Sequence, residues 1–177
     1  MTTTTARDDR GMTLIELIVG ISVTALVLGL IASVFINGFT AQREGVARDA
    51  ATGAANVVST SLSTSVRNST TIRANTAGTR LDAGYIGADG APECRAWELR
   101  GDALVYRAST TGALPAADDS WGELATGVVG TLTDGAVFQV DTSSSLQMGM
   151  DITVDGITVA VTDGVVAQAV STGGLSC

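Results

Sequence analysis

Few side chains in this sequence could carry out chemistry, because its 177 residues include no His and its ten basic residues are all Arg. Without His there is no ordinary Ser–His or Cys–His pair to activate a nucleophile, and His-based metal sites are excluded. The remaining candidates are one carboxylate near the N-terminus, Glu16, two cysteines and a short acidic cluster. An enzymatic function is therefore disfavoured.

Glu16 stands at the edge of a long apolar run. Residues 17–42 carry no charge, and residues 17–36 are strongly apolar. About 20 apolar residues cross the core of a bilayer as a helix, so this run is long enough to span a membrane. A carboxylate near the centre of such a helix costs about 2.5–3.5 kcal/mol, and less toward the interface. An intramembrane charge of this kind indicates a function and requires a partner.

The residues before the apolar run could supply that partner. Residues 1–11 are polar and include two Arg, which favour a cytoplasmic leader by the positive-inside rule. An ordinary secretory signal is cleaved after a shorter apolar segment, whereas the plausible cleavage point here, between Gly11 and Met12, precedes the apolar run. Cleavage there creates a new α-amino group close to Glu16. In an assembly of parallel, staggered helices, that amine can neutralise the Glu16 of a neighbour.

The sequence Gly11-Met12-Thr13-Leu14-Ile15-Glu16-Leu17 resembles the processing site of type IV pilins and type II secretion pseudopilins. The resemblance implies that a membrane prepilin peptidase cuts after Gly11 and methylates Met12, which stands where the family usually has Phe. It also implies that Glu16 serves assembly. The implied partners are other pilin or pseudopilin subunits, the peptidase, an assembly platform with its ATPase and, before assembly, membrane lipid. No cofactor is implied.

The downstream sequence resembles, in a less specific way, the minor J-type pseudopilins and W-type minor pilins. The residues that carry this likeness are 97–107, Trp121, 124–128 and a strand around Phe138. The resemblance implies a minor structural subunit of a filament that starts in the bacterial cell membrane and reaches the cell surface. The alternative is a single-pass membrane-anchored binding module that does not polymerise. Glu16 separates the two, since only a polymer supplies it with a neighbour's amine.

The cysteines, Cys94 and Cys177, are the only two in the chain. The part of the chain outside the membrane would lie in a compartment where disulfides persist. Members of the family often attach their C-terminus to the rest of the fold with a disulfide. We therefore expect the two cysteines to pair. A bond between residues 94 and 177 would close a long loop, which stabilises a fold by about 4–5 kcal/mol in the chain-entropy model. The alternative is two free thiols or an intermolecular bond.

Two surface motifs suggest further functions, but ordinary structure accounts for both. Asp118, Asp119 and Glu123 could form an oxygen-rich Ca²⁺ loop, but their spacing is not diagnostic and a solvated acidic loop explains them better. We therefore expect no metal. Arg100-Gly101-Asp102 spells a cell-adhesion tripeptide, and a hairpin turn between two strands explains it better.

The downstream part of the chain is strongly acidic. Residues 81–177 contain three Arg against thirteen Asp and Glu residues. Nucleic-acid binding depends on neutralising phosphates with basic side chains, so an acidic surface is repelled by nucleic acid and by anionic lipid headgroups. We expect no direct nucleic-acid binding by this part.

A long helix must hold Glu16. After the apolar run, Ala and Val recur at three- and four-residue spacing with charged residues between them, which predicts an amphipathic continuation. The helix is expected over residues 13–66, with 12–36 in the membrane or filament core and 37–66 as the amphipathic part. Residues 67–177 are expected to form an extracellular β-rich head, so the predicted fold class is α+β with an antiparallel sheet.

The expected strands are marked by turn residues. Residues 67–90 are rich in Thr, Asn, Ala and Gly and predict a connecting loop. Gly101-Asp102 and Asp155-Gly156 each separate two strand-like segments and predict two-residue hairpins. Asp163-Gly164 predicts a further turn of the same kind, which would make the last third of the chain an antiparallel meander.

Overall fold

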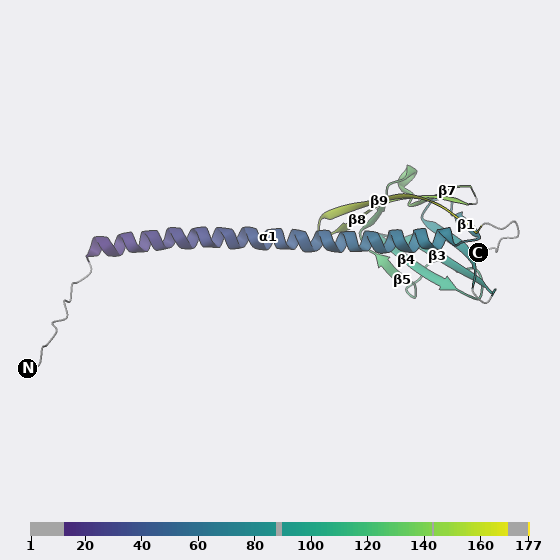
Figure 1. Ribbon diagram of the computed structural model, residues 1–177, viewed down its shortest axis with the longest axis horizontal. Helices are drawn as coiled ribbons and strands as arrows, with labels where there is room; N and C mark the ends of the chain where they lie inside the picture. The colour runs from purple at the N-terminus through teal and green to yellow at the C-terminus, as the bar shows by residue number, and fades with distance from the viewer. Residues whose placement is uncertain (1–12, 88–89, 143, 170–176) are drawn as a thin grey trace, which may run out of the picture. The chain divides into compact units, whose positions relative to one another are not determined.

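The structure, a computed structural model, describes residues 13–87, 90–142, 144–169 and 177. One long helix is followed by strands and a single-turn 3-10 helix, η1 (Figure 1). In chain order the elements are α1 (Leu14–Arg67), β1 (Thr71–Ala74), β2 (Arg80–Ile86), β3 (Pro92–Arg100), β4 (Ala103–Ser109), β5 (Gly122–Ala125), β6 (Val128–Gly130), η1 (Thr133–Gly135), β7 (Phe138–Thr142), β8 (Ser145–Val154) and β9 (Ile157–Val166).

The helix α1 spans 54 residues and begins and ends within one residue of the predicted bounds, 13 and 66. No proline, which would break a helix, occurs before Pro92. The chain divides after Arg43 into two compact units. In the first unit, the described part of α1 is exposed along its whole length.

Within the second unit, α1 buries one side. The buried positions follow the three- and four-residue spacing that the sequence predicts, and the first three of them are alanines. They are Ala47, Ala51, Ala55, Val58, Leu62, Ser65 and Val66. In Figure 1, β8 and β9 lie above this part of α1, and β4 and β5 lie below it.

The first sheet contains β1 to β5, side by side in chain order and antiparallel throughout. The predicted hairpin at Gly101-Asp102 is confirmed: Arg100 lies opposite Ala103, and Gly101 has a φ of 65°. A positive φ is readily adopted by glycine, which has no Cβ.

The connecting loop predicted for residues 67–90 is wrong, because β1 and β2 lie within that stretch. Ile72, Leu81 and Ala83 are buried in the core, with at most 4% of their surface exposed. These few apolar residues alternate with polar ones, so each strand has one side in the core and one outside. Burial of that one side outweighs a composition typical of loops.

The second sheet is centred on β8. β9 pairs with β8 along its whole length on one side, while β6 and β7 pair with the two halves of β8 on the other. The predicted hairpin at Asp155-Gly156 is confirmed, and both residues have positive φ, 48° and 81°. Two positive φ values define the type I′ turn, whose twist suits a two-residue hairpin.

The second predicted turn, at Asp163-Gly164, is wrong. Both residues lie inside β9, where they oppose Met148 and Gln147 of β8. Neither has the positive φ that such a turn requires. Pairing with β8 on both sides of this dipeptide keeps the backbone extended, so β9 continues to Val166.

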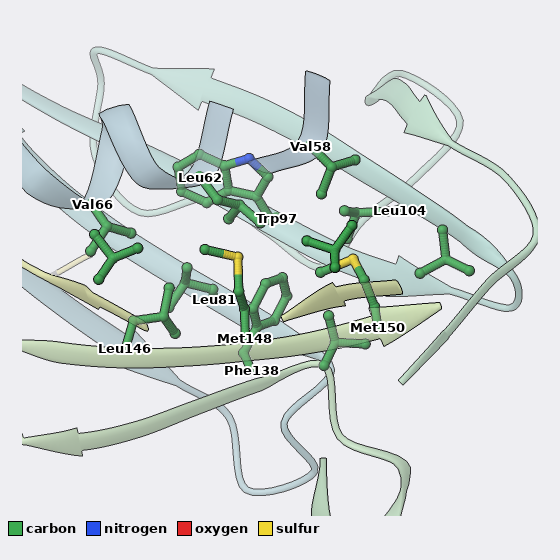
Figure 2. Close-up of a cluster of buried hydrophobic side chains, with 14 of the residues drawn as sticks. Val58, Leu62, Val66, Leu81, Trp97, Leu104, Phe138, Leu146, Met148 and Met150 are labelled. Atoms are coloured by element: carbon green, nitrogen blue, oxygen red, sulfur yellow. The ribbon is translucent and has the colours of Figure 1, made fainter. Parts of the chain in front are cut away.

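The core lies where α1 and the two sheets meet. Figure 2 shows side chains from all three layers pointing toward one another. The labelled residues are each at most 1% exposed: Val58, Leu62, Val66, Leu81, Trp97, Leu104, Phe138, Leu146, Met148 and Met150. The Trp97 indole N–H also donates to the Ser61 hydroxyl at 3.3 Å, which satisfies its donor beside α1. The predicted α+β class, a long helix packed on antiparallel sheets, is confirmed.

The two sheets are joined at Gly78, in the turn between β1 and β2. The Gly78 carbonyl oxygen accepts hydrogen bonds from the amides of Val137 and Phe138, at 2.9 and 2.8 Å. A Cβ at Gly78 would come within 2.4 Å of the Ala136 side chain and 2.7 Å of the Phe138 carbonyl oxygen. Glycine is therefore required for the close approach of the two sheets.

The segment from 110 to 121 covers the outer face of the first sheet, where Trp121 packs against Ala96 and Val105. Arg80 holds this segment, because its guanidinium donates to the carbonyl oxygens of Leu114 and Pro115 at 2.8 Å each. The same guanidinium pairs with two carboxylates of the sheet, Asp82 at 2.8 Å and Glu98 at 3.1 Å.

Candidate functional site

Thr13 directly precedes α1, and Glu16 follows it by three residues, in the first turn of the helix. The Thr13 hydroxyl oxygen accepts a hydrogen bond from the Glu16 amide at 3.3 Å, and the Thr13 carbonyl oxygen accepts one from the Leu17 amide at 3.2 Å. A Thr that caps the amide three residues later is one half of a capping box. The helix therefore begins at a defined residue, and the Glu16 carboxylate stands at a defined place in its first turn.

Sequence reasoning missed the role of Thr13. The signal was present, because Thr13 followed three residues later by Glu16, just before an apolar run, is the capping-box pattern. Glu16 can therefore stabilise the start of the helix, since an acidic residue in the first turn also interacts favourably with the helix dipole.

The Glu16 carboxylate has no ion-pair partner among the residues that the structure describes in its own unit. The single cation in that range is Arg43, which stands 27 residues further along α1, about 40 Å away at 1.5 Å per residue. No cation in this range can therefore neutralise Glu16.

The helix after Glu16 presents an uncharged and largely apolar surface as far as residue 42. Large apolar side chains such as Leu26, Ile31 and Phe35 are exposed on all sides, and α1 is long and apolar enough to cross a membrane. The hydroxyls of Ser22 and Thr24 donate to the carbonyl oxygens four residues earlier, at 2.8 and 2.7 Å. Polar groups satisfied within the helix are compatible with an apolar surrounding.

The predicted cleavage point lies outside the described residues, since the description begins at Thr13. Gly11, Met12 and the leader of residues 1–11 therefore have no structural account. The structure does place Thr13, two residues after Gly11, at the start of the regular helix.

The two cysteines are joined in the structure. The Cys94 and Cys177 sulfurs are 2.08 Å apart, and their Cα atoms are separated by 5.7 Å. Cys94 is buried in β3 of the first sheet. The bond therefore fastens residue 177 to the β-rich part of the chain.

The acidic candidates near β5 are not brought together around one point. Asp118 accepts hydrogen bonds from the Ser120 hydroxyl and amide, and Asp119 pairs with Arg100 at 2.6 Å. The Ser120 hydrogen bonds and the neighbouring arginines lower the pKa of Asp118 below its usual value. Within the described ranges, no three Asp, Glu, Cys or His side chains, Glu123 included, are grouped as metal ligands would be.

The Arg100-Gly101-Asp102 tripeptide occupies the turn between β3 and β4. The Asp102 carbonyl oxygen accepts a hydrogen bond from the Val128 amide at 2.8 Å, which connects this turn to β6. Arg100 is engaged by Asp119. Structural contacts thus account for these residues.

Comparison with known proteins identifies one family feature. The prokaryotic N-terminal methylation motif matches residues 6–32 of the chain, which include the predicted cleavage point, Glu16 and much of the apolar run. No curated protein and no solved structure matches the chain. The chain therefore carries the N-terminal signature of type IV pilins and pseudopilins. This signature extends into a long helix whose later part packs on antiparallel sheets, a pilin-like arrangement.

Proposed function

We propose that the chain is a prepilin that becomes a minor structural subunit of a type IV pilus or a type II-secretion-like pseudopilus. The observation that carries this proposal is the match of the N-terminal methylation motif to residues 6–32, in which Glu16 directly precedes the uncharged apolar run of the helix. The leader is 1–11, the filament-core helix 12–36, its amphipathic continuation 37–66, and the extracellular head 67–177.

Processing prepares the chain for assembly. A prepilin peptidase cuts between Gly11 and Met12 and methylates the new Met12 amine. Before the cut, the nitrogen of Met12 is an uncharged amide; after it, the nitrogen is an ammonium group. Cleavage thus creates the cation that Glu16 lacks within the described part of its own unit.

Assembly then pairs subunits along their helices. In parallel helices staggered along a common axis, the Met12 ammonium of one subunit reaches the Glu16 carboxylate of the next. Both charges leave the lipid interface for an apolar core, so the pair must form well to offset their desolvation. An unprocessed chain, or one without Glu16, would leave a single buried charge.

The membrane is the starting point of this sequence of events. The apolar helix holds the chain in the bacterial cell membrane with its leader on the cytoplasmic side, and lipid surrounds the helix before other subunits do. The peptidase, the assembly platform and its ATPase then act on it, and the product is a cell-surface filament. The role of the chain is structural rather than catalytic.

The cleavage step is tested by the mass of the mature protein. Chain recovered from the membrane and surface fractions of the native host should begin at Met12 and carry one methyl group on its N-terminus. The same chain in a host that lacks the peptidase should keep residues 1–11. A surface form that keeps Met1, or one that begins beyond residue 36, would contradict the proposal.

A further inference from the structure

β9 forms a free edge of the second sheet. It pairs with β8 at ten positions, from Val154 opposite Ile157 to Ser145 opposite Val166, and no described strand pairs with its other side. A long edge strand can pair with a strand of another chain, and proteins usually block it with Pro, Lys or a bulge. Residues 157–166 contain no Pro, Lys or Arg.

The hairpin register shows which backbone groups of β9 face outward. The two-residue turn at Asp155-Gly156 makes Val154 and Ile157 a hydrogen-bonded pair. Bonded and non-bonded pairs alternate along an antiparallel ladder, so Asp163 is bonded to β8 and Gly164 is not. The Gly164 N–H and C=O therefore point toward the free edge. The same alternation turns the backbone groups of four further residues outward: Thr158, Ala160, Thr162 and Val166.

The Asp163 side chain already binds one of these outward groups. Its Oδ1 accepts a hydrogen bond from the Gly164 amide at 2.8 Å. The carboxylate thus occupies the place where the carbonyl oxygen of an added strand would have to lie.

The position of Asp163 in the alternation supports this role. Val161 and Val165, two residues to either side, are buried at 7% and 2% exposure, so Asp163 takes a place on the core-facing side of β9. It is nevertheless exposed, because β9 is an edge strand. An inward-facing charge on an edge strand is one of the devices that prevent sheets from joining.

We propose that Asp163 blocks the addition of another β-strand to the free edge of β9, and so keeps the heads of different copies from joining by sheet extension. An added strand would have to displace the carboxylate from the Gly164 amide. It would also have to enclose an unpaired charge between two backbones, which is unfavourable. This inference concerns the head alone and holds whether or not the chain forms a filament.

The test compares Asp163→Val with Asp151→Val in the full-length chain in detergent micelles. Asp151 lies in β8, between Val129 of β6 and Ala160 of β9, so the control makes the same change in a strand that is paired on both sides. Sedimentation velocity should show Asp163→Val self-associating at a concentration about tenfold lower than the wild type and the control do, a difference of ~1.4 kcal/mol. Asp163→Asn, which keeps an acceptor but no charge, should fall between them.

Hydrogen exchange identifies the surface through which the variant associates. When the Asp163→Val variant associates, the outward amides of Thr158, Ala160, Thr162 and Gly164 should gain protection from exchange. The carbonyl oxygens of an added strand would accept hydrogen bonds from them. The proposal is overturned if Asp163→Val and Asp151→Val associate alike. It is also overturned if Asp163→Val associates while these four amides remain unprotected.

Discussion

At the scale of single residues, the head places a few polar side chains against its core, and Arg95 and Tyr85 lie in contact there. Arg95, in β3, donates to the Ser65 hydroxyl at 3.3 Å, and its guanidinium carbon lies 4.4 Å from the centre of the Tyr85 ring. Tyr85 is 6% exposed, and its burial raises the pKa of its hydroxyl to about 12. An ionised Tyr85 is therefore unfavourable in the folded head.

This burial predicts a loss of stability at high pH. In the unfolded chain Tyr85 ionises near its usual pKa of 10.0, and in the folded head near 12. Between these values the unfolded state releases a proton that the folded state keeps, so stability is complete below pH 10 and falls as the pH rises to 12. The loss amounts to about 2–3 kcal/mol.

Tyr85→Phe should remove most of this pH dependence. Urea unfolding of the two proteins in detergent, from pH 9 to 11.5, measures it. Tyr106, whose pKa burial also raises, is present in both proteins, so the difference between the curves reports on Tyr85. If the unfolding free energies of wild type and variant fall in parallel as the pH rises, Tyr85 is not the source of the pH dependence.

Sequence reasoning at this scale identified residues that stand out by type. Glu16 is a charge beside an apolar run, and Cys94 and Cys177 are the only cysteines, so each was visible without a structure. Arg80 was not, because the groups that it binds, the carbonyl oxygens of Leu114 and Pro115, lie 34 and 35 residues away in sequence. Backbone acceptors leave no mark in a sequence.

At the scale of elements, the contact between the two sheets depends on Gly78. Its φ of 65° is unfavourable for other residues, and a Cβ would overlap Ala136 and the Phe138 carbonyl. Gly78→Ala should therefore destabilise the head by roughly 2–4 kcal/mol, from the left-handed backbone and from overpacking together. Thermal unfolding in detergent measures this change.

Gly101→Ala is the matched control. Gly101 has the same φ of 65°, but nothing lies within 4 Å of the place where a Cβ would be. Its substitution should cost only the backbone term of about 1–2 kcal/mol. Equal losses for the two variants would mean that the contact between the sheets is not tight at Gly78.

The elements themselves were predictable where their signals were local. The helix has a continuous pattern without proline, and Asp155-Gly156 has a strand-like segment on each side, so both were correctly predicted. Asp163-Gly164 has the same two residue types, and only pairing with β8 shows that it lies inside a strand. β1 and β2 pair with strands that are near in sequence, but their composition is typical of loops, which is why they were taken for a loop.

At the scale of the whole molecule, α1 has two environments. Before Arg43 its surface is apolar and exposed, and after Arg43 one of its sides is buried under the sheets. The exposed apolar helix requires lipid or other helices around it, while the head has a core of its own. This division of roles suits a subunit held through its helix.

The most direct test of this account is the incorporation of Glu16 variants into filaments. Glu16→Gln keeps a residue suited to the capping box but removes the charge, whereas Thr13→Ala removes the cap, at a cost of about 1 kcal/mol, and keeps the charge. Loss of one partner from a buried pair costs about 3–5 kcal/mol, so removing the carboxylate should lower incorporation by about a hundredfold or more.

Quantitative immunoblots of membrane and sheared-filament fractions measure this incorporation beside the wild type. The account predicts that Glu16→Gln and Glu16→Ala are processed and stable in the membrane but scarce in filaments, whereas Thr13→Ala incorporates nearly as well as the wild type. Wild-type levels of Glu16→Ala in the filament fraction would contradict the pairing of Glu16 with a neighbour's amine.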